Sequence, residues 1–284
     1  MKTEHSSDQG PALATPLRAV LPGLGLDLGG IFCAPLWGGR LRLTLSLGRK
    51  LWIPLTMRPL LVKGPWGTGL LDAAVGDPDP LRWRKFSVEP PHPPLEEQVR
   101  AFGITPEDVD FLFLSHFHFD HAGGALKGGR PRFPRAEILV HREEWEEALA
   151  VDRAGGLARR VARAYPPGRI RLLSEGGELF PGFHVLPAPG HTGGLMVVRL
   201  AGTREEGWFT SDLLPVARSF RLQRDAHSDE DPDRALRHRK QVGAAMAARC
   251  SLAFLYHDPR SWVARVLAPA ERAGVAGIAC LGRS

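Results

Sequence analysis

The sequence predicts a layered α/β fold in which β-sheets are covered by helices. Short apolar runs of strand length alternate along the chain with segments of helical periodicity, and interleaved elements of this kind pack as sheets with helices on their faces. The composition is 43% hydrophobic and 24% charged, which is typical of a globular protein with a sizeable core. The 284 residues correspond to one large domain built from two halves, or to about two domains of ~150 residues.

The expected elements follow from apolar periodicity and from turn residues. The expected strands are Pro59–Lys63, Gly69–Ala73, Phe111–Ser115, Glu137–His141, Arg169–Leu173, His184–Leu186, Leu195–Leu200, Gly207–Thr210 and Leu252–Tyr256. The expected helices are Leu95–Phe102, Glu143–Tyr165 with an interruption near Gly155 and Gly156, Pro232–Arg249 and Ser261–Ala268. Asp231 before Pro232 is typical of an N-cap followed by proline at the first helical position.

Composition also excludes several classes of protein. The chain has no apolar run near the ~18 residues that cross a bilayer, and its first residues lack the apolar core of a secretory signal. Three cysteines without a CxxC pair do not form a disulfide framework, so we expect a cytoplasmic protein. The net charge of +6 comes from scattered arginines, so we do not expect a surface dedicated to binding nucleic acid.

The segment from Phe111 to Gly124 carries the chemistry. It reads FLFLSHFHFDHAGG, a strand followed by a His-x-His-x-Asp-His cluster. Imidazoles at i and i+2 of an extended segment point to one side, and we expect Asp120 and His121 to begin the next helix. His116, His118, Asp120 and His121 are therefore predicted to converge on one cleft. Imidazole and carboxylate groups are ligands that suit zinc and similar divalent metals.

Three further residues are candidate ligands because each follows an apolar run. His191 lies in the turn PGHTGG at 189–194, Asp212 ends the run GWFTSD, and His257 ends the run LAFLYH and precedes Asp258. Strand ends gather along one edge of a sheet, so these residues are expected to meet the histidine cluster. The remaining histidines are expected to be non-ligands; they are His5, His92, His141, His184, His227 and His238.

These motifs together resemble the metallo-β-lactamase superfamily. The resemblance covers about residues 55–260 and is carried by HFHFDH at 116–121, PGHTGG at 189–194, SD at 211–212 and HD at 257–258. It implies a four-layer αββα sandwich. We expect a single such domain over 16–284. The polar residues 1–15 are expected to form a mobile tail, and the Pro-rich and polar segments near 86–95 and 213–233 are expected to form pocket loops.

The resemblance also implies a set of roles. A first metal would be held by His116, His118 and His191, a second by Asp120, His121 and His257, and Asp212 would bridge the two. Asp72 matches an acidic position behind the ligands that orients an imidazole. The family usually has Asp-Thr-Gly there, whereas this chain has Asp-Ala-Ala.

Two divalent metal ions, with zinc as the default, predict a hydrolase in which a metal-bridging hydroxide attacks a lactone or another ester-type bond. Asp120 would orient the nucleophile and move its proton. The motifs look most like the branch that contains quorum-quenching lactonases and organophosphate hydrolases, which suggests N-acyl homoserine lactones or another small molecule as substrate. Within that branch, small lactonases have a substrate-contacting tyrosine three residues after the bridging aspartate, and here that residue is Pro215.

Several alternatives stay open at this point. A phosphotriester hydrolase and a nucleic-acid-processing nuclease share the metal motif, as do thiolester hydrolases and iron dioxygenases. Iron, manganese or cobalt could replace zinc. Tyr256 is expected to point away from the site because it neighbours His257 on a strand. The apolar segment 31–37 could line a substrate pocket, or it could belong to the core or to a homodimer interface.

Overall fold

The computed structural model describes residues 25–46, 50–78, 87–151, 156–222, 228–267 and 277–283. Two seven-stranded sheets dominate it. The N-terminal sheet has the order β1 (Leu26–Asp27), β2 (Phe32–Pro35), β5 (Leu60–Gly64), β6 (Gly67–Leu71), β8 (Phe111–Phe113), β11 (Glu137–His141) and β12 (Ile170–Leu173). The C-terminal sheet has the order β13 (Gly177–Phe180), β14 (Phe183–Pro187), β15 (Met196–Ala201), β16 (Glu206–Phe209), β17 (Leu252–Phe254), β18 (Ser261–Leu267) and β19 (Gly277–Arg283).

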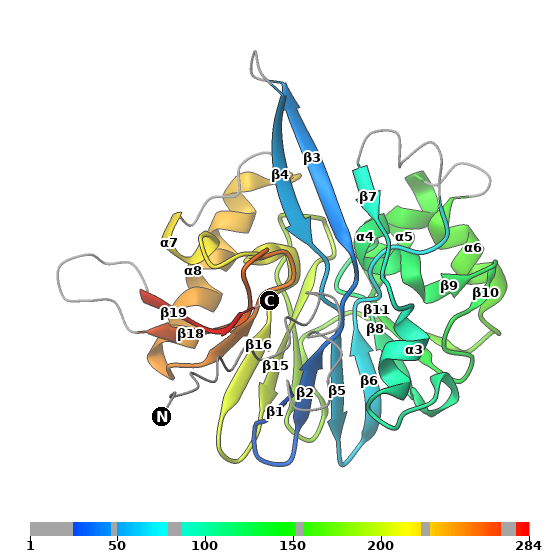
Figure 1. Ribbon diagram of the computed structural model, residues 1–284, viewed down its shortest axis with the longest axis horizontal. Coiled ribbons are helices and arrows are strands. Elements are labelled where there is room, and N and C mark those ends of the chain that lie inside the picture. The colour runs from blue at the N-terminus through cyan, green and yellow to red at the C-terminus, as the bar shows by residue number, and fades with distance from the viewer. Residues whose placement is uncertain are drawn as a thin grey trace, which may run out of the picture.

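Helices flank the two sheets on their outer sides (Figure 1). One flank carries α3 (Leu95–Arg100), α4 (Phe119–Ala122), α5 (Arg142–Val151) and α6 (Leu157–Ala164), and the other carries α7 (Ser219–Leu222) and α8 (Pro232–Ala248). Short 3-10 turns lie at Pro106–Asp108, Gly123–Ala125 and Ser211–Leu213. The mixed α/β class expected from the sequence is confirmed. No helix among the described residues is long and apolar enough to cross a membrane.

Strand alternation divides the core into layers. Phe111 and Phe113 of β8 pack between the two sheets, whereas Leu112 and Leu114 pack under the flanking helices. In the C-terminal sheet, Phe209 faces the space between the sheets and its neighbour Trp208 faces α8. Because side chains of a strand alternate between faces, each sheet is apolar on both sides and is held between two hydrophobic layers.

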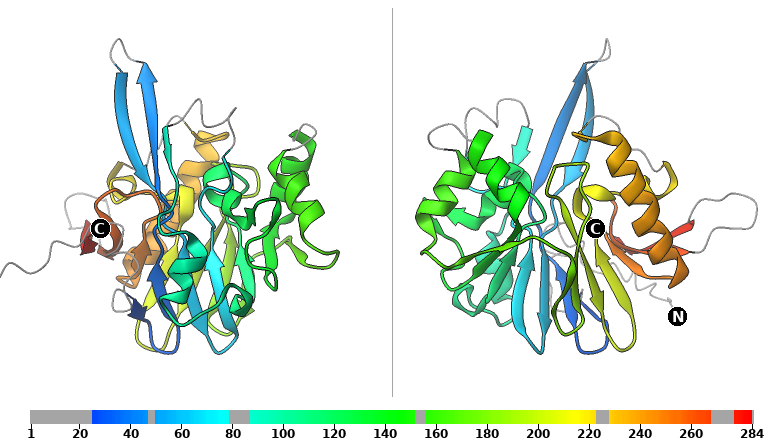
Figure 2. Two further views of the ribbon diagram at one scale, coloured as in Figure 1. Left: turned by 45° about the vertical axis from the view of Figure 1, so that its right-hand side comes forward. Right: turned by 180° about the vertical axis from the view of Figure 1, so that it is seen from behind.

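A separate small sheet forms an arm. It consists of β4 (Lys50–Thr56), β3 (Arg40–Ser46) and β7 (Ser87–Glu89), and the β3–β4 hairpin extends beyond the body of the molecule (Figure 2). A last pair joins β9 (Leu126–Lys127) to β10 (Arg130–Pro131). The arm matters for function because β4 ends at Thr56, whose backbone N–H donates to the carbonyl of His257 at 3.3 Å.

The helix expected over Ser261–Ala268 is wrong. Residues Ser261–Leu267 form β18, which pairs antiparallel with β17 and β19. Its side chains are buried on both faces, with Trp262 and Val263 between the sheets and Ala264 and Val266 under α8. Burial on both faces removes the polar alternation that marks an exposed strand, so the pattern resembled a short apolar helix.

Two other expectations change in the structure. The expected helix over Glu143–Tyr165 forms as the separate helices α5 and α6 on either side of the predicted interruption. The segment 31–37 contains β2 and belongs to the core, since Cys33, Ala34, Leu36 and Trp37 are at most 2% exposed. The tail over 1–15 and part of each expected pocket loop lie outside the described residues.

Candidate metal centre

Strand ends bring the predicted site residues to one edge of the two sheets. β6 runs parallel to β8, and β16 runs parallel to β17, so their carboxyl ends lie on the same side of each sheet. Asp72 follows β6, and the histidine cluster follows β8; Asp212 follows β16, and His257 follows β17. His191 lies in the turn between β14 and β15. The structure therefore brings together all eight residues that the sequence singled out.

Seven of the eight residues form two adjoining groups. The first contains His116, His118, His191 and Asp212, and the second contains Asp120, His121 and His257. Within each group, one ligand atom from every residue lies within 4.8 Å of the others. This separation is short enough for one ion to contact all of the donors of a group.

In the first group, donor atoms from three histidines surround one carboxylate oxygen. His118 Nδ1 lies 2.9 Å from His116 Nε2 and 3.2 Å from His191 Nε2. Asp212 Oδ2 lies 3.1 Å from His191 Nε2 and 3.9 Å from His116 Nε2. Nitrogen and oxygen donors in this arrangement are typical of zinc ligands.

Asp212 also connects the first group to the second. Its other oxygen, Oδ1, lies 3.3 Å from His121 Nε2 and 3.1 Å from His257 Nε2. Asp120 Oδ2 completes the second group at 3.8 Å from His121 Nε2 and 3.6 Å from His257 Nε2. One carboxylate thus offers a separate oxygen to each group, as a bridging ligand does.

The donor set fits a cation better than a hydrogen-bonded cluster. His121 Nδ1 lies 2.7 Å from Asp72 Oδ2, and His257 Nδ1 lies 2.7 Å from the carbonyl oxygen of Thr56. Both oxygens only accept hydrogen bonds, so each Nδ1 donates and Nε2 is the ring nitrogen left to face the group. The two Nε2 atoms lie 3.2 Å apart and face Asp212 Oδ1, a buried oxygen without a hydrogen-bond donor among the described residues.

The pKa values follow from the same charges. Burial and the neighbouring imidazoles lower the pKa of His118 to about 4 and that of His116 well below its usual value. Burial also disfavours the charged form of His191, but the Asp212 carboxylate outweighs it and raises the pKa of His191 to about 9. Burial raises the pKa of Asp212, yet the histidines around it hold the value well below the usual range. Burial likewise lowers the pKa of His121, but Asp212, Asp120 and Asp72 outweigh it and raise the value well above the usual one. The carboxylates therefore favour positive charge in the centre, whereas burial and the crowded imidazoles oppose it at His116 and His118.

The carboxylates mark the open side of the centre. The side chains of Asp120 and Asp212 are 12% and 13% exposed, whereas those of His116, His121, His191 and His257 are at most 4% exposed. These four imidazoles therefore form the floor of the site, whereas the side chain of His118 is more exposed and lies on the open side with the carboxylates. A substrate would approach from the side of the two aspartates.

Asp72 lies behind His121, as the resemblance implied. Its carboxylate accepts hydrogen bonds from the Ser115 backbone N–H and Oγ, each at 2.8 Å, and from Ser211 Oγ at 3.2 Å, in addition to its contact with His121. Asp72 has a left-handed backbone with φ of 58°, a region that aspartate and asparagine tolerate better than other side chains. The residue is fully buried and fixes the orientation of the His121 ring.

Sequence reasoning missed Asp229, which supports His191 in the same way. Asp229 Oδ1 lies 3.3 Å from His191 Nδ1, and both oxygens of Asp229 accept from the guanidinium of Arg239 at 2.7 and 2.9 Å. The side chains of Asp229 and Arg239 are each 1% exposed. Asp229 lies in a polar segment and Arg239 on α8, so only the fold places this ion pair behind the ligand.

Glu144 and Arg58 are two further supports that the sequence did not reveal. Glu144 at the start of α5 accepts from the Phe117 backbone N–H at 2.7 Å and from Thr192 Oγ1 at 2.6 Å, which ties together two ligand-bearing loops. Arg58 Nη1 donates to the carbonyl of Asp258 and to Thr56 Oγ1. Arg58 therefore holds the corner that follows His257.

The expected orientation of Tyr256 is wrong. Its ring stacks on His121 with 4.2 Å between the ring centroids, and its hydroxyl donates to the carbonyl of Asp120 at 2.7 Å. Tyr256 shares the face between the sheets with Phe254, and that face leads to the metal-binding edge. Pro215 occupies the position of the expected tyrosine, and its carbonyl accepts from the His257 backbone N–H at 3.0 Å.

The other described histidines lie outside both groups. They are His92, His141, His184 and His238; His5 and His227 fall outside the described residues. His238 Nδ1 lies 2.9 Å from the carbonyl oxygen of Pro189, so it supports the turn that carries His191.

The fold and this donor set define a class of protein. Residues 61–249 match the model of the metallo-beta-lactamase superfamily, so the chain belongs to that superfamily and the resemblance inferred from the motifs is confirmed. Among curated relatives, the chain is 28% identical to the N-acyl homoserine lactonase AiiA of Bacillus thuringiensis subsp. kurstaki. The match extends over 166 residues, which cover 56% of this chain and 60% of the relative. It is 42% identical over 65 residues to the N-acyl homoserine lactonase AttM of Azorhizobium caulinodans, which is 22% of this chain and 23% of that relative. The matched part thus spans about 60% of AiiA.

Solved structures show the same fold. A probable metal-dependent hydrolase from Staphylococcus aureus superposes with a TM-score of 0.77 at 19% identity, over 90% of this chain and 99% of the other. AidC, described as a dizinc quorum-quenching lactonase, gives a TM-score of 0.73 at 21% identity, over 92% and 97% of the two chains. The hydrolase AbOPH gives a TM-score of 0.73 at 19% identity, over 90% and 96%.

Proposed function

We propose that this protein is a dinuclear metal-dependent hydrolase that opens a lactone or cleaves a similar ester-type bond. The observation that carries the proposal is the position of Asp212, whose two oxygens face different donor groups. In this proposal His116, His118 and His191 hold one ion, Asp120, His121 and His257 hold the other, and Asp212 contacts both. Zinc is the metal we expect from the nitrogen and oxygen donors.

The bound ions would polarise a substrate oxygen and would lower the pKa of water far enough for hydrolysis at neutral pH. The protein would supply orientation and proton transfer. Asp120 is the proposed proton acceptor, because a carboxylate that directs one oxygen to a metal site keeps the other to hold or move a proton. Tyr256 fixes Asp120 in place through the hydrogen bond to its carbonyl.

The matched relatives and the missing tyrosine guide the choice of substrate. The curated relatives are N-acyl homoserine lactonases, which makes these lactones the first small molecules to test and quorum quenching the corresponding role. Pro215 cannot provide the hydroxyl that small lactonases use, so the substrate carbonyl must be oriented by other groups. The three cysteines are free, which supports our proposal of a reducing, cytoplasmic location.

Metal analysis and a substrate panel test the function together. We expect close to two equivalents of metal per chain, and loss of lactonase or esterase activity when a chelator removes them. The panel contains lactones, aryl esters, phosphotriesters and structured RNA, so it separates the lactonase from an organophosphate hydrolase and from a nuclease. Full activity in metal-free protein would refute the proposal.

Two substitutions test the ligand assignment. Asp212→Ala should lower metal occupancy at both sites, whereas His257→Ala should mainly empty one. His92→Ala is the matched control, since His92 lies outside both groups and should leave both equivalents in place. Unchanged occupancy in Asp212→Ala would contradict the assignment.

A further inference from the structure

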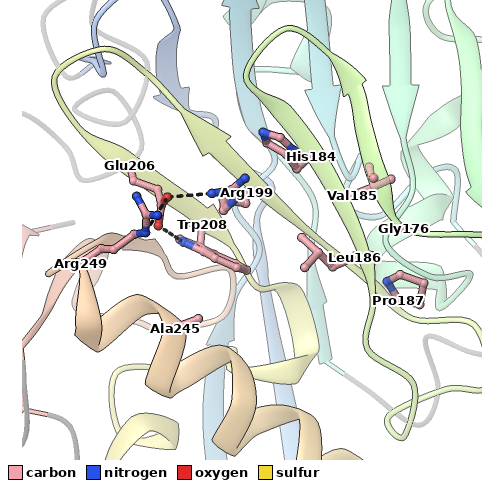
Figure 3. A pocket seen from close by; sticks show the side chains of 11 residues that line it. Gly176, His184, Val185, Leu186, Pro187, Arg199, Glu206, Trp208, Ala245 and Arg249 are labelled. Atoms are coloured by element: carbon pink, nitrogen blue, oxygen red, sulfur yellow. Dashed lines mark hydrogen bonds and ion pairs between the residues drawn. The ribbon is translucent and has the colours of Figure 1, made fainter.

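A cavity lies away from the metal centre, on the outer face of the C-terminal sheet (Figure 3). Its volume is about 510 Å³, which is within the range of small-molecule sites. Strands β14, β15 and β16 form its floor, and Ala245 and Arg249 at the end of α8 form one wall. No residue of the two metal-binding groups lines it.

The floor carries a row of polar and aromatic side chains at one level of the sheet. His184 of β14 is the register partner of Arg199 of β15, and Arg199 is the partner of Trp208 of β16. Partners in antiparallel strands project from the same face. The three side chains therefore point into the cavity from three neighbouring strands, as Figure 3 shows.

The single carboxylate in this lining is already fully engaged. Glu206 Oε1 accepts from Trp208 Nε1 at 2.8 Å and from Ser251 Oγ at 2.7 Å, and Oε2 accepts from Arg199 Nη1 at 3.2 Å. Burial raises the pKa of Glu206, but these hydrogen bonds outweigh it and lower the pKa. Glu206 is thus ionised and neutralises only one of the two arginines beside it.

Cationic and hydrogen-bond donors remain available in the cavity. Within the described part of the chain, Arg199 uses only Nη1 in a hydrogen bond, and the Nε atom of Arg249 approaches Glu206 Oε2 no closer than 3.9 Å. His184 Nε2 lies 3.9 Å from Glu178 Oε1, beyond hydrogen-bond distance. Two guanidinium groups and an imidazole therefore have N–H groups left for a ligand.

The opposite wall of the cavity is apolar. Leu186 and Pro187 of β14 face the end of α8 across the cavity, and the Trp208 indole lies between them and the arginines. A site with convergent cationic donors at one end and apolar groups at the other suits an amphipathic anion.

We propose that this cavity binds an organic monoanion, with a carboxylate between Arg199 and Arg249 and a compact apolar body against Leu186, Pro187 and Trp208. The planar guanidinium of Arg199 pairs well with a carboxylate, because two N–H groups can donate in parallel. This site is independent of the metal centre. It therefore does not depend on the proposed hydrolase activity.

Calorimetric titration of the metal-loaded protein with 2-naphthoate tests the site, and 2-naphthalenemethanol serves as the uncharged comparison. We expect naphthoate to bind with one equivalent per chain and the alcohol to bind at least about tenfold more weakly, which corresponds to the loss of a charge-assisted pair. Equal binding of the two compounds would overturn the proposal.

Substitutions then locate the bound naphthoate. Arg199→Met and Arg249→Met should each weaken binding about tenfold, whereas the matched control Arg265→Met should not, because Arg265 pairs with Glu205 and does not line the cavity. Glu206→Gln should tighten binding, since it removes the competing charge. Its amide oxygen can still accept from Trp208, while its NH₂ group no longer accepts from Arg199 and so frees that guanidinium. Weaker binding in Glu206→Gln, or an equal loss in Arg265→Met, would refute the charge-based site.

A final control separates this cavity from the metal centre, because carboxylates also bind metal ions. Naphthoate binding should persist in Asp212→Ala and after treatment with a chelator. Binding that disappears with the metal would place naphthoate at the metal centre and overturn the proposal. Hydrolase activity of Arg249→Met reports on folding and should be unchanged, as its side chain is 68% exposed.

Discussion

Replacing Asp72 with asparagine should weaken one of the two metal sites without unfolding the protein. Asparagine has the same size and tolerates the left-handed backbone that Asp72 adopts. The carboxylate accepts four hydrogen bonds, from His121, from the backbone and side chain of Ser115, and from Ser211. The asparagine side chain has only one oxygen, so its amide NH₂ must face at least one of these donors.

The size of the effect follows from that mismatch. If the amide oxygen keeps the Ser115 backbone N–H, the NH₂ group faces His121 Nδ1, and the imidazole proton must move to Nε2. A protonated Nε2 has no lone pair for the metal. An unsatisfied buried polar group costs about 1–3 kcal/mol, which agrees with the 10- to 100-fold loss of metal affinity typical when a residue that orients a ligand is changed.

A zinc titration in competition with a chromophoric chelator measures this loss. We expect one of two equivalents to bind 10- to 100-fold more weakly in Asp72→Asn, with circular dichroism unchanged. Asp110→Asn is the matched control, because Asp110 precedes β8 at the opposite end of the strand and accepts from the Thr68 backbone N–H. Wild-type affinity for both equivalents in Asp72→Asn would refute the argument that Asp72 sets the His121 tautomer.

Three further predictions concern the other supports of the centre. Asp229→Asn should weaken binding of the ion held by His191 and lower the melting temperature. It leaves the buried Arg239 without its counter-charge, a change that typically costs about 3–5 kcal/mol of stability. An unchanged melting temperature would contradict this. Arg58→Met should lower zinc affinity while leaving the melting temperature equal or higher. The apolar replacement removes a 4% exposed cation that makes no ion pair in the described part of the chain and is attracted by Asp258 only from further away. Parallel loss of zinc affinity and melting temperature would indicate a general structural role. Zinc should bind more tightly as pH rises from 6 to 9, with net release of protons. Asp212 raises the pKa of His191 to about 9 against the effect of burial, and the His191 proton must leave before a metal binds. Calorimetry in buffers of different ionisation enthalpy detects that release, and a zinc affinity independent of pH would argue against it.

The sign of the His191 shift also affects the metal-free protein. Because the pKa of His191 is raised in the folded state, its protonated form stabilises that state at low pH. This contribution disappears as pH rises through about 9. Metal affinity changes in the opposite direction over the same range. Thermal unfolding with and without zinc at pH 6 and pH 9 should therefore diverge with increasing pH.

The donor residues could be predicted because each directly follows an apolar strand. Their convergence depends on strand order, for example on β16 lying beside β17, which the local patterns do not give and which the resemblance to the superfamily implied. Asp229 could not be predicted, because its role requires α8 to place Arg239 beside it. The strand Ser261–Leu267 reads as a helix in the sequence because burial on both of its faces hides the polar alternation. The orientation of Tyr256 does not follow from strand alternation, because the space between the sheets, to which its ring points, ends at the metal-binding edge.

Each of the two donor groups draws residues from both halves of the chain. His116 and His118 follow the N-terminal sheet, and His191 follows a strand of the C-terminal sheet; the second group likewise joins Asp120 and His121 to His257. Any ion bound here would cross-link the N-terminal and C-terminal halves of the molecule. Loss of the ion would then lower the stability of the folded protein as well as abolish its activity. In a cell with too little of that ion, we expect the protein to be degraded faster.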